Sequence, residues 1–544
     1  MSWTKLELTR PGKNKAFELE PRILIEKPEL SYGDPNTENM LIHWDNLLAL
    51  KALEQNYTWR IKCIYIDPPF NTWAAFEYYD DWIEHTIRLN LMYQRMKILW
   101  NLLKEDWWII FVELDDVEVH YCKVIMDEIF RRDNFICSIA IKSSTPSWLK
   151  TAHKNKTIIK QKDFILVYKK WGTLNLNPQY SISNKRDSHY NYYLDKETLQ
   201  LSSLKDIIIS KWIFDKNIKP DDYDTQDPKF KAFYMENSDS IFQTGKSMPE
   251  DARAESLKPE NKDKVVPYWN GQFAYNWRRL SPLSSSINEV VSRTEISQEI
   301  SKLVCDFWDD VDFNNTQNEW WVNFPASKKP EILLMRILRL ATNPWDLVLD
   351  SFLWSGTTAA VAHKMWRKWI WIELWDHAYS HCKVRLDNVI DWEQWWVSPA
   401  LWREWWGWYK FYELWPSVLK QDTFWNYIIN PNFNSSELIQ AICKIENFTY
   451  KAYDDNIKHG YSTEKDFIHV TTRHVTQDVI DDIQKTILQD WESMLIVAKT
   501  YEGNLDLPDN IQIKKIPTEI LDKCEYNKDN YSLPISEEDI KDED

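Results

Sequence analysis

The stretch DLVLDSFLWSGTTAAVAHKMWRKWIWIEL, residues 346–374, decides the fold class. It begins with a short apolar run at 346–350 and passes through a loop rich in small residues. A helical pattern follows from Thr357, and a second apolar run occupies 369–374. Short apolar runs that alternate with helices are typical of a parallel sheet covered by helices. The stretch therefore predicts a strand, a loop, a helix and a strand of an α/β fold.

The same alternation occurs on both sides of this stretch. Residues 331–341 predict a helix directly before it, and the leucine spacing in LIHWDNLLALKALEQ, from residue 41, predicts a strand followed by a helix. A further helix is expected around 89–104. Buried strands are expected at three more apolar runs, 61–66, 109–114 and 163–168. The predicted α/β core is thus split into two halves along the chain.

The segment between the two halves has a different character. Residues 171–300 are polar, rich in lysine, aspartate and proline, and only weakly periodic, which indicates a separate insert. After residue 400, helix and strand signals are mixed and end in an acidic tail. The expected domains are an N-terminal extension at 1–40, core halves at 41–170 and 301–400, an insert at 171–300 and a C-terminal region at 401–544.

The composition restricts the class of protein. With 544 residues, 44% hydrophobic and 27% charged, the chain has the balance of a soluble protein of several domains. Its seven cysteines form no CxxC pair and have no partner at metal-ligand spacing, which argues against disulfides and a zinc site. There is no signal-peptide pattern, and no apolar run approaches the roughly 20 residues that span a bilayer. We therefore expect a cytoplasmic protein without a metal.

The charge is unevenly distributed. The net charge is −17, yet residues 140–170 hold eight lysines against one aspartate. A local basic strip can contact phosphates even in an acidic protein. Double-stranded DNA therefore stays open as a partner, with a solvated lysine-rich loop as the alternative.

Glycine and tryptophan occur in unusual numbers. The chain has 9 glycines and 32 tryptophans, whereas a chain of this length would usually have about 38 glycines. Four tandem pairs each follow a polar residue, in contexts where turns need small residues: Trp107-Trp108, Trp320-Trp321, Trp395-Trp396 and Trp405-Trp406. We interpret many of these tryptophans as glycines, encoded by UGA codons that the source organism reads as glycine. The alternative is a genuinely tryptophan-rich protein.

The first candidate site is IYIDPPFNT, residues 64–72. Asp67 follows a predicted buried strand, at the carboxyl edge where α/β sheets bind ligands. Pro68 and Pro69 fix the turn so that the Asp67 carboxylate and the Pro68 carbonyl can face a cleft. Phe70 can stack on an extruded base, and two acceptors on its amino N–H bonds would make a ring amine more reactive. Such a turn can also simply end a strand.

The second candidate site is the loop within 346–374. Asp350 ends the strand, and Ser355-Gly356-Thr357-Thr358 open the helix. A loop whose backbone approaches a cofactor has no room for an indole, so Trp354 fits the interpretation as glycine. Glu373 ends the next strand, at about the spacing at which an acid binds ribose hydroxyls. Loops of this kind also bind dinucleotides or only turn the chain.

These motifs together resemble the β-class DNA amino-methyltransferases that use S-adenosylmethionine, in particular the modification subunits of type III restriction systems. In that family an Asp-Pro-Pro-aromatic motif precedes Phe-x-Gly-Ser-Gly-Thr-Thr, with a target-recognition insert between them, as here. Supporting blocks are HWDNLLALKAL from His43, LKEDWWIIFVELDDVEVHYCKVIMDEIF from Leu103, FPASKKPEILLMRIL from Phe324 and, more loosely, IPTEILDKCEY near 516. The resemblance implies a Rossmann-like doubly wound methyltransferase sheet, circularly permuted in motif order, with a C-terminal α/β region.

The resemblance also implies residue roles. Asp67, Pro68, Pro69 and Phe70 would bind and activate the target base. The cofactor pocket would be lined by Asp45, Lys329, Asp350, Phe352, Trp354, Ser355, Gly356, Thr357 and Glu373. Departures from the family pattern are tryptophans at or beside positions where the family has or tolerates glycine: Trp44, Trp73, Trp345, Trp354, Trp366, Trp369, Trp371 and Trp375. Trp277 and Trp308 lie in contexts where a true tryptophan fits.

The implied activity is methyl transfer from S-adenosylmethionine to adenine N6 in double-stranded DNA, after the base is flipped out. Cytosine N4 is the runner-up, because both amines offer Asp67 the same geometry. A homodimer is implied, and a restriction subunit is a further candidate partner. A catalytically silent DNA-recognition subunit is the alternative from another class. A nicotinamide-dependent oxidoreductase would leave the Asp-Pro-Pro-Phe motif unexplained.

Overall fold

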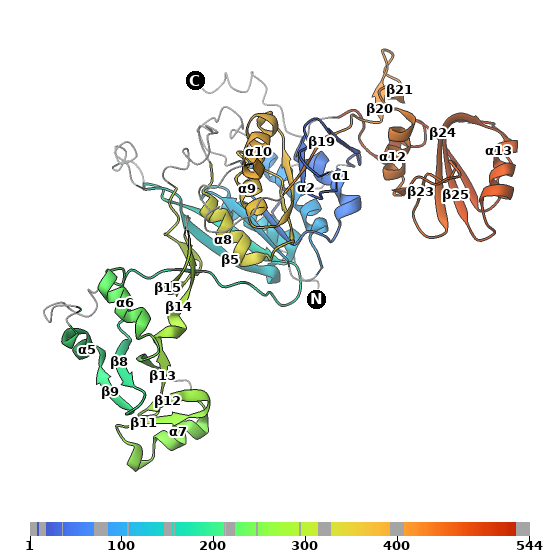
Figure 1. The fold of residues 1–544 in the computed structure, drawn as a ribbon. Coiled ribbons are helices and arrows are strands. Elements are labelled where there is room, and N and C mark those ends of the chain that lie inside the picture. The colour runs from blue at the N-terminus through green and yellow to red at the C-terminus, as the bar shows by residue number, and fades with distance from the viewer. Residues whose placement is uncertain are drawn as a thin grey trace. The chain divides into compact units, whose positions relative to one another are not determined.

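The computed structural model describes residues 8–9, 13, 18–34, 36–69, 85–105, 108–145, 155, 158–211, 213, 224–245, 248–292, 295–313, 328–391 and 407–528. The described chain forms two compact units (Figure 1). One contains the residues up to Asn177 and those from Asp306 onward, and the other contains Pro178–Cys305. Each unit is described separately.

A ten-stranded sheet, in the order β1-β19-β2-β18-β17-β3-β4-β6-β5-β16, forms the centre of the first unit. The strands from β19 to β4 are parallel, whereas β1 and β6 run antiparallel to their neighbours. The strands are β1 Leu24–Glu26, β2 Met40–His43, β3 Cys63–Ile66, β4 Ile109–Leu114, β5 Phe135–Lys142, β6 Lys162–Lys169, β16 Phe307–Trp308, β17 Leu347–Asp350, β18 Lys368–Glu373 and β19 Lys410–Leu414.

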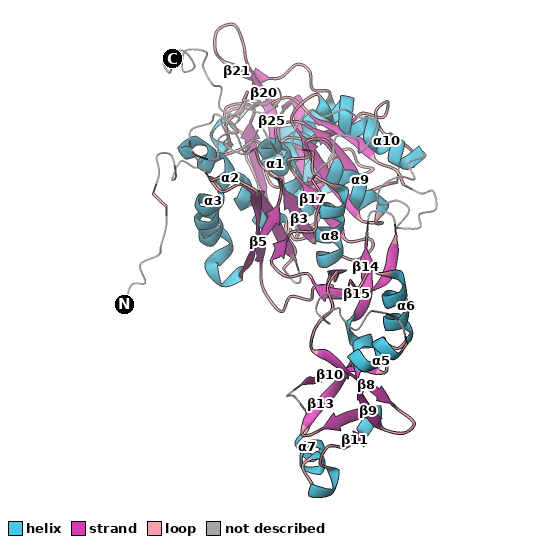
Figure 2. Ribbon diagram, turned by 90° about the vertical axis from the view of Figure 1, so that its left-hand side faces the viewer, coloured by secondary structure: helices cyan, strands magenta, loops and turns pink. Residues whose placement is uncertain are grey.

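Helices cover both faces of this sheet. Figure 2 shows α2 and α3 on one side of the strands and α8 and α9 on the other. The helices are α1 Asn46–Tyr57, α2 His85–Leu102, α3 Val119–Met126, α8 Glu331–Ala341, α9 Thr357–Lys364 and α10 Val384–Asp391. The apolar strands between these layers are buried on both faces, as in β3 and β4, where every residue is buried. This is the doubly wound α/β arrangement that the sequence predicted.

Most predicted core elements are confirmed within a few residues. The apolar runs at 109–114 and 163–168 are β4 and β6, and the helix expected around 89–104 is α2. Two strands of the core sheet were not anticipated: β1 lies within the expected N-terminal extension, and β19 lies beyond residue 400. Both lie at the same edge of the sheet, where β19 pairs with β2 and β1 pairs with β19. The core sheet therefore uses chain from outside 41–170 and 301–400.

The second unit is mainly antiparallel β structure. A six-stranded sheet has the order β11-β12-β13-β10-β8-β9, and a three-stranded sheet has the order β14-β15-β7. The strands are β7 Tyr180–Ile182, β8 Tyr190–Asp195, β9 Gln200–Ser203, β10 Ile241–Gly245, β11 Val265–Tyr268, β12 Gln272–Tyr275, β13 Arg278–Pro282, β14 Ile287–Val291 and β15 Ile296–Leu303. The helices are α5 Leu204–Ser210, α6 Pro228–Glu236 and α7 Glu250–Ser256. Phe230, Tyr234 and Ile241 lie in its core.

The C-terminal region contains its own five-stranded sheet, β22-β23-β24-β25-β26, after the short hairpin of β20 and β21. The bounds are β20 Leu419–Gln421, β21 Tyr427–Ile429, α12 Ser435–Ile445, β22 Thr449–Tyr450, β23 Gly460–Tyr461, β24 Asp466–Val475, α13 Gln477–Asp482, β25 Ser493–Tyr501 and β26 Ile511–Lys515. Strands β24 to β26 are parallel. Within the described ranges of the whole chain, no helix has the length and apolar character needed to cross a membrane.

Candidate active site

Asp67 lies directly after β3, in the middle of the parallel part of the sheet. β3 pairs with β4 on one side and with β17 on the other. The carboxyl ends of these three strands therefore meet at one edge, which is where open α/β sheets bind ligands. Asp67 is 6% exposed, and Pro68 and Pro69 are buried beside it. Phe70 lies outside the described residues.

The Asp67 carboxylate belongs to a buried cluster of charged groups. The Lys329 ammonium lies 3.2 Å from Asp67 Oδ2 and 2.6 Å from Glu113 Oε1. Glu113 is the second-last residue of β4, and its other oxygen accepts a hydrogen bond of 2.7 Å from the Tyr65 hydroxyl. Lys329 thus holds two carboxylates from neighbouring strands at the same edge.

Burial and charge act in opposite directions in this cluster. Burial raises the pKa of Asp67 well above its usual value, Lys329 opposes this rise, and Glu113 adds to it. Burial would lower the pKa of Lys329, but the Asp67 and Glu113 carboxylates together raise it. Lys329 therefore stays a cation. A buried carboxylate with a raised pKa is a stronger proton acceptor than one in water.

The second half of the site lies on the adjacent strands β17 and β18. Asp350 ends β17, and its Oδ1 accepts a hydrogen bond of 2.9 Å from the Phe352 backbone N–H. Glu373 ends β18, and its two oxygens accept hydrogen bonds from the backbone N–H groups of Trp354, at 2.8 Å, and Trp375, at 3.2 Å. Burial raises the pKa of Asp350 to about 7 and that of Glu373 to about 8.

The Trp354 side chain connects the two halves. Its indole Nε1 donates a hydrogen bond of 2.7 Å to the backbone carbonyl of Asp67. The residue is 8% exposed and has a φ of 55°, in the left-handed region. The indole therefore fills space between the end of β3 and the loop after β17. A glycine at this position would leave that space open.

The remaining residues of the loop after β17 are contacted by residues from the helical segment after β18. Gly356, with a φ of 77°, precedes α9, and a Cβ atom there would lie 3.4 Å from the Cys382 backbone. The Arg385 guanidinium from α10 donates to the Ser355 carbonyl at 3.3 Å and to Thr357 Oγ1 at 2.9 Å. The loop is thus fixed by Arg385 at Ser355 and Thr357 and by Glu373 at the Trp354 N–H.

Arg385 is itself fixed by a buried carboxylate. Glu331, the first residue of α8, accepts hydrogen bonds from Arg385 at 3.1 Å and from Lys364 at 3.0 and 3.1 Å. All three side chains are at most 1% exposed. Because Lys329 lies only two residues before Glu331, this short segment connects the Asp67 cluster to the support of the loop.

Two further predicted residues have structural contacts. Asp45 is the N-cap of α1: its carboxylate accepts hydrogen bonds from the N–H groups of Leu47 and Leu48, and Arg95 lies 3.2 Å from its other oxygen. Phe352 is buried in the main apolar core. Lys329, predicted for the cofactor pocket, contacts Asp67 and Glu113.

The lysine-rich segment 140–170 is less available to phosphates than its sequence indicates. Lys170 is 4% exposed, and its ammonium donates to the backbone carbonyls of Trp100 and Leu103 near the end of α2. Lys160 pairs with Asp163 at 2.9 Å, and Lys162 lies 3.8 Å from Asp116. The expectation of a phosphate contact is therefore wrong for Lys170. Lys150, Lys154 and Lys156 lie outside the described residues.

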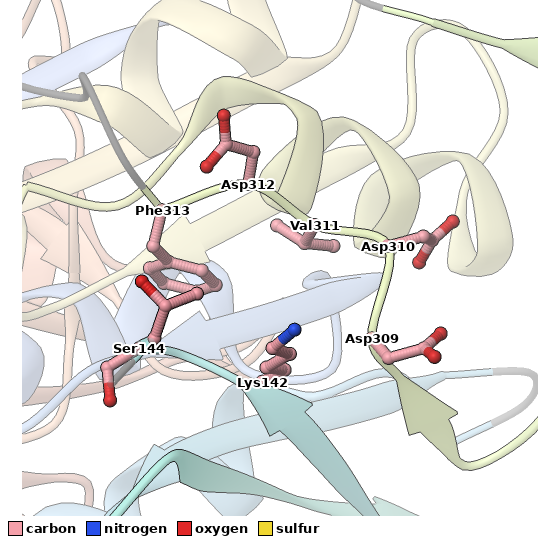
Figure 3. Close-up of a pocket in the computed structure, with 8 residues that line it drawn as sticks. Lys142, Ser144, Asp309, Asp310, Val311, Asp312 and Phe313 are labelled. Carbon is pink, nitrogen blue, oxygen red and sulfur yellow. The ribbon is translucent and has the colours of Figure 1, made fainter. Parts of the chain in front are cut away.

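Lys142, the last residue of β5, lines a cavity of about 240 Å³. Figure 3 shows its amino group turned toward the loop that carries Asp309, Asp310 and Asp312. Asp310 accepts two hydrogen bonds of 2.7 Å from Arg336. The acidic lining disfavours a phosphate at this cavity. Within the described ranges, no group of His, Cys, Asp and Glu side chains could hold a metal ion.

Sequence reasoning missed Glu113, Glu331 and Arg385. Glu113 could have been found by the argument that found Asp67, because it lies near the end of the next predicted strand. Glu331 and Arg385 gave no such signal. Their partners are far away in the chain, and a charge near the start or end of a helix is usually solvated.

Comparisons with known proteins identify the family of the chain. Residues 61–383 match the model of a family described as DNA methylase. The chain is 31% identical over 408 residues to the probable type III restriction-modification enzyme HindVI Mod subunit of Haemophilus influenzae, covering 68% of this chain and 53% of that protein. It is 26% identical to the StyLTI Mod subunit of Salmonella typhimurium, covering 64% of this chain and 53% of that protein. The chain thus spans about half the length of these relatives. Among solved structures, the cytosine-N4-specific PvuII DNA methyltransferase is similar with a TM-score of 0.31 and 13% identity, covering 70% of this chain and 98% of that one.

Proposed function

The chain belongs to the DNA methylase family, and we propose that it transfers a methyl group from S-adenosylmethionine to the N6 amine of adenine in double-stranded DNA. One observation carries this proposal: Asp67 and the loop of Trp354 to Thr357 follow the carboxyl ends of β3 and β17, which are adjacent parallel strands. A base amine held by Asp67 would therefore face a cofactor held by that loop. Adenine as the base follows from the family resemblance of the motifs, and the similarity to Mod subunits fits that resemblance.

The residues present fit the cofactor when position 354 is small. Glu373 offers a buried carboxylate for ribose hydroxyls, and the left-handed backbone at Gly356 favours a glycine in the loop. Asp350 supplies a second acceptor at the same edge. S-adenosylmethionine, when bound, supplies an electrophilic methyl group on a positively charged sulfur.

The chain's own groups prepare the amine. The Asp67 carboxylate accepts a hydrogen bond from the amino group, which weakens delocalisation of the nitrogen lone pair into the ring, and it can then accept the proton that the nitrogen loses. Lys329 keeps Asp67 in place and favours its charged form. Phe70 would stack on the flipped base. Arg385 and Glu331 hold the loop so that the two reactants meet in line.

Several further assignments accompany this proposal. The insert at 171–300 would read the DNA sequence, because base-reading residues in such enzymes lie outside the methyl-transfer site. A second copy of this chain and a restriction subunit are the proposed partners, since the relatives carry type III restriction-modification names. We place the protein in the cytoplasm, where its DNA substrate lies.

The test is transfer of labelled methyl groups from S-adenosylmethionine to DNA by the Trp354→Gly variant. After digestion to nucleosides, label in N6-methyladenine supports the proposal. Label in N4-methylcytosine would move the activity to the runner-up base. Absence of label in both nucleosides, with cofactor bound, would reject methyl transfer.

A silent recognition subunit is the second candidate, and the Trp354 indole within the site favours it. This candidate requires tight DNA binding without methyl transfer. It is excluded if the chain methylates DNA.

Cofactor affinity should depend on pH through Glu373. Its raised pKa of about 8 means that the carboxyl is mostly neutral at pH 7 and ionised at pH 9. An ionised carboxylate is the stronger acceptor for ribose hydroxyls. We therefore expect the S-adenosylmethionine dissociation constant to fall between pH 7 and pH 9, as measured by titration calorimetry. Glu373→Gln should remove the part of this change centred near pH 8, and an unchanged profile in that variant would refute the assignment.

A further inference from the structure

Tryptophan is over-represented among residues whose backbone is left-handed. Thirteen described residues other than glycine have positive φ, and six of them are tryptophans: Trp59, Trp277, Trp345, Trp354, Trp366 and Trp425. Four others are asparagines, the residue type that tolerates this conformation best after glycine. A side chain with a Cβ atom is strained in this conformation whatever contacts its ring makes. The local structure at each tryptophan shows what residue the backbone requires.

Trp366 follows the end of α9 in the geometry of a Schellman motif. The Arg367 N–H donates to the Ala362 carbonyl at 3.0 Å, and the Trp366 N–H donates to the His363 carbonyl at 3.2 Å. These two hydrogen bonds define the motif. The first residue after the helix C-cap is usually glycine in this motif, and here it is Trp366, with a φ of 62°. Trp59 has a φ of 60° and likewise follows the C-cap of α1.

Trp345 occupies the third position of a turn that begins at Asn343. The Asp346 N–H donates to the Asn343 carbonyl at 3.2 Å, Pro344 is the second residue, and Trp345 has a φ of 71°. A turn with proline second and positive φ third is a type II turn, which calls for glycine at the third position. Trp345 is 63% exposed, and its ring contacts that of Trp366, another left-handed tryptophan, with 5.7 Å between the ring centres.

Trp277 occupies the second position of a two-residue hairpin loop. Asn276 and Trp277 connect β12 to β13 with φ values of 45° and 64°. Two consecutive positive φ angles define a type I′ turn, for which Asn-Gly is the preferred sequence. The sequence context of Trp277 fits a true tryptophan, whereas the backbone favours glycine.

Trp425 lies in the hairpin between β20 and β21. Its N–H donates to the Asp422 carbonyl at 3.1 Å, which closes a turn, and its φ is 65°. A turn followed by a left-handed residue is a common hairpin connection, with glycine at the left-handed position. Trp425 is 80% exposed.

We propose that the natural protein has glycine at positions 59, 277, 345, 354, 366 and 425, and that its cells translate the corresponding codons as glycine. Five of these positions are assigned by turn or helix-end geometry alone, independently of any reaction. Position 354 rests also on the proposed function, because glycine there opens the space between Asp67 and Glu373. Trp308 is not among them: it lies in the extended strand β16, is 1% exposed, and has the Arg336 guanidinium 5.2 Å from its ring centre.

Peptide mass spectrometry of the protein purified from its own cells tests this directly. Peptides that cover the six positions should each be lighter than the printed sequence by the difference between a tryptophan and a glycine residue. The peptide that covers Trp308 should have the printed mass. Tryptophan at positions 354 and 366 would overturn the proposal. Glycine there without any methyl transfer would reject the proposed function and leave this inference intact.

A stability comparison on recombinant protein gives a second test. Trp366→Gly should raise the melting temperature by roughly 2–4 °C, because glycine adopts the left-handed conformation without strain. Trp366→Ala is the matched control, since it removes the ring but keeps a Cβ atom, and it should give a smaller rise. Trp308→Gly should lower the melting temperature. Equal shifts for Trp366→Gly and Trp366→Ala would contradict the backbone argument.

Discussion

We expect Asp67→Ala to lower kcat for DNA methylation by roughly 10²–10⁴-fold, the usual contribution of a positioned proton acceptor. The carboxylate is the group that would hold the base amine, and alanine offers no acceptor in its place. S-adenosylmethionine affinity should change by only about threefold or less, because Glu373 and the 354–357 loop would remain intact. Single-turnover methylation and titration calorimetry, both in the Trp354→Gly background, measure the two effects separately.

Two further variants make this result interpretable. Asp67→Asn keeps the shape and one acceptor oxygen but loses the charge, so it should also be nearly inactive if the carboxylate accepts a proton. Asp116→Ala removes a half-exposed carboxylate beyond the neighbouring strand β4 and should leave kcat unchanged. Unchanged turnover in Asp67→Ala would remove this residue from the reaction.

The second large effect is expected at Glu331. Glu331→Leu removes the carboxylate that Lys364 and Arg385 both contact within the core. Breaking a buried ion pair by removing one partner typically costs about 3–5 kcal/mol, because a charge stays buried without compensation. Burial would raise the pKa of Glu331, but the two cations hold it below its usual value, so the carboxylate is charged at neutral pH. Urea unfolding should show the loss as a lower midpoint.

A surface pair provides the comparison. Asp481 lies 4.0 Å from Lys485, and both side chains are at least half exposed. Asp481→Asn should change the stability by less than about 1 kcal/mol. If Glu331→Leu were as mild as Asp481→Asn, the buried contacts would not stabilise the fold. If Glu331→Gln weakened S-adenosylmethionine affinity but left the melting temperature unchanged, Glu331 would position the 354–357 loop without stabilising the fold.

The core of the fold could be predicted because its strands are buried on both faces. The runs that became β3, β4, β6, β17 and β18 are continuous apolar sequences, so each is visible without knowledge of its neighbours. The strands of the second unit are different. In β8, for example, buried and exposed residues alternate irregularly, and polar residues fill the exposed positions. Their pairing depends on partners that the sequence does not identify.

The part of the candidate site that could be predicted consists of residues at the end of a strand or in the loop directly after it. Asp67, Asp350 and Glu373 each end a buried strand, and the parallel sheet brings such ends together. The supporting contacts could not be predicted in this way. Glu113 meets Lys329, and Glu331 meets Arg385, only because the sheet and its helices bring distant segments into contact. Asp45, which the family resemblance places at the cofactor, has a second role that the sequence did not indicate, because it caps α1.

The hairpin at Asn276 and Trp277 also bears on how a gene is read. Codon meanings are normally established by comparing genes with the proteins they encode. Here the backbone gives the information, because a left-handed turn favours glycine in every organism, whatever codon encodes it. A sequence translated with the wrong codon assignment would therefore still show, at each left-handed turn, which residues are wrong. Backbone geometry can therefore indicate which positions of a translated gene require glycine.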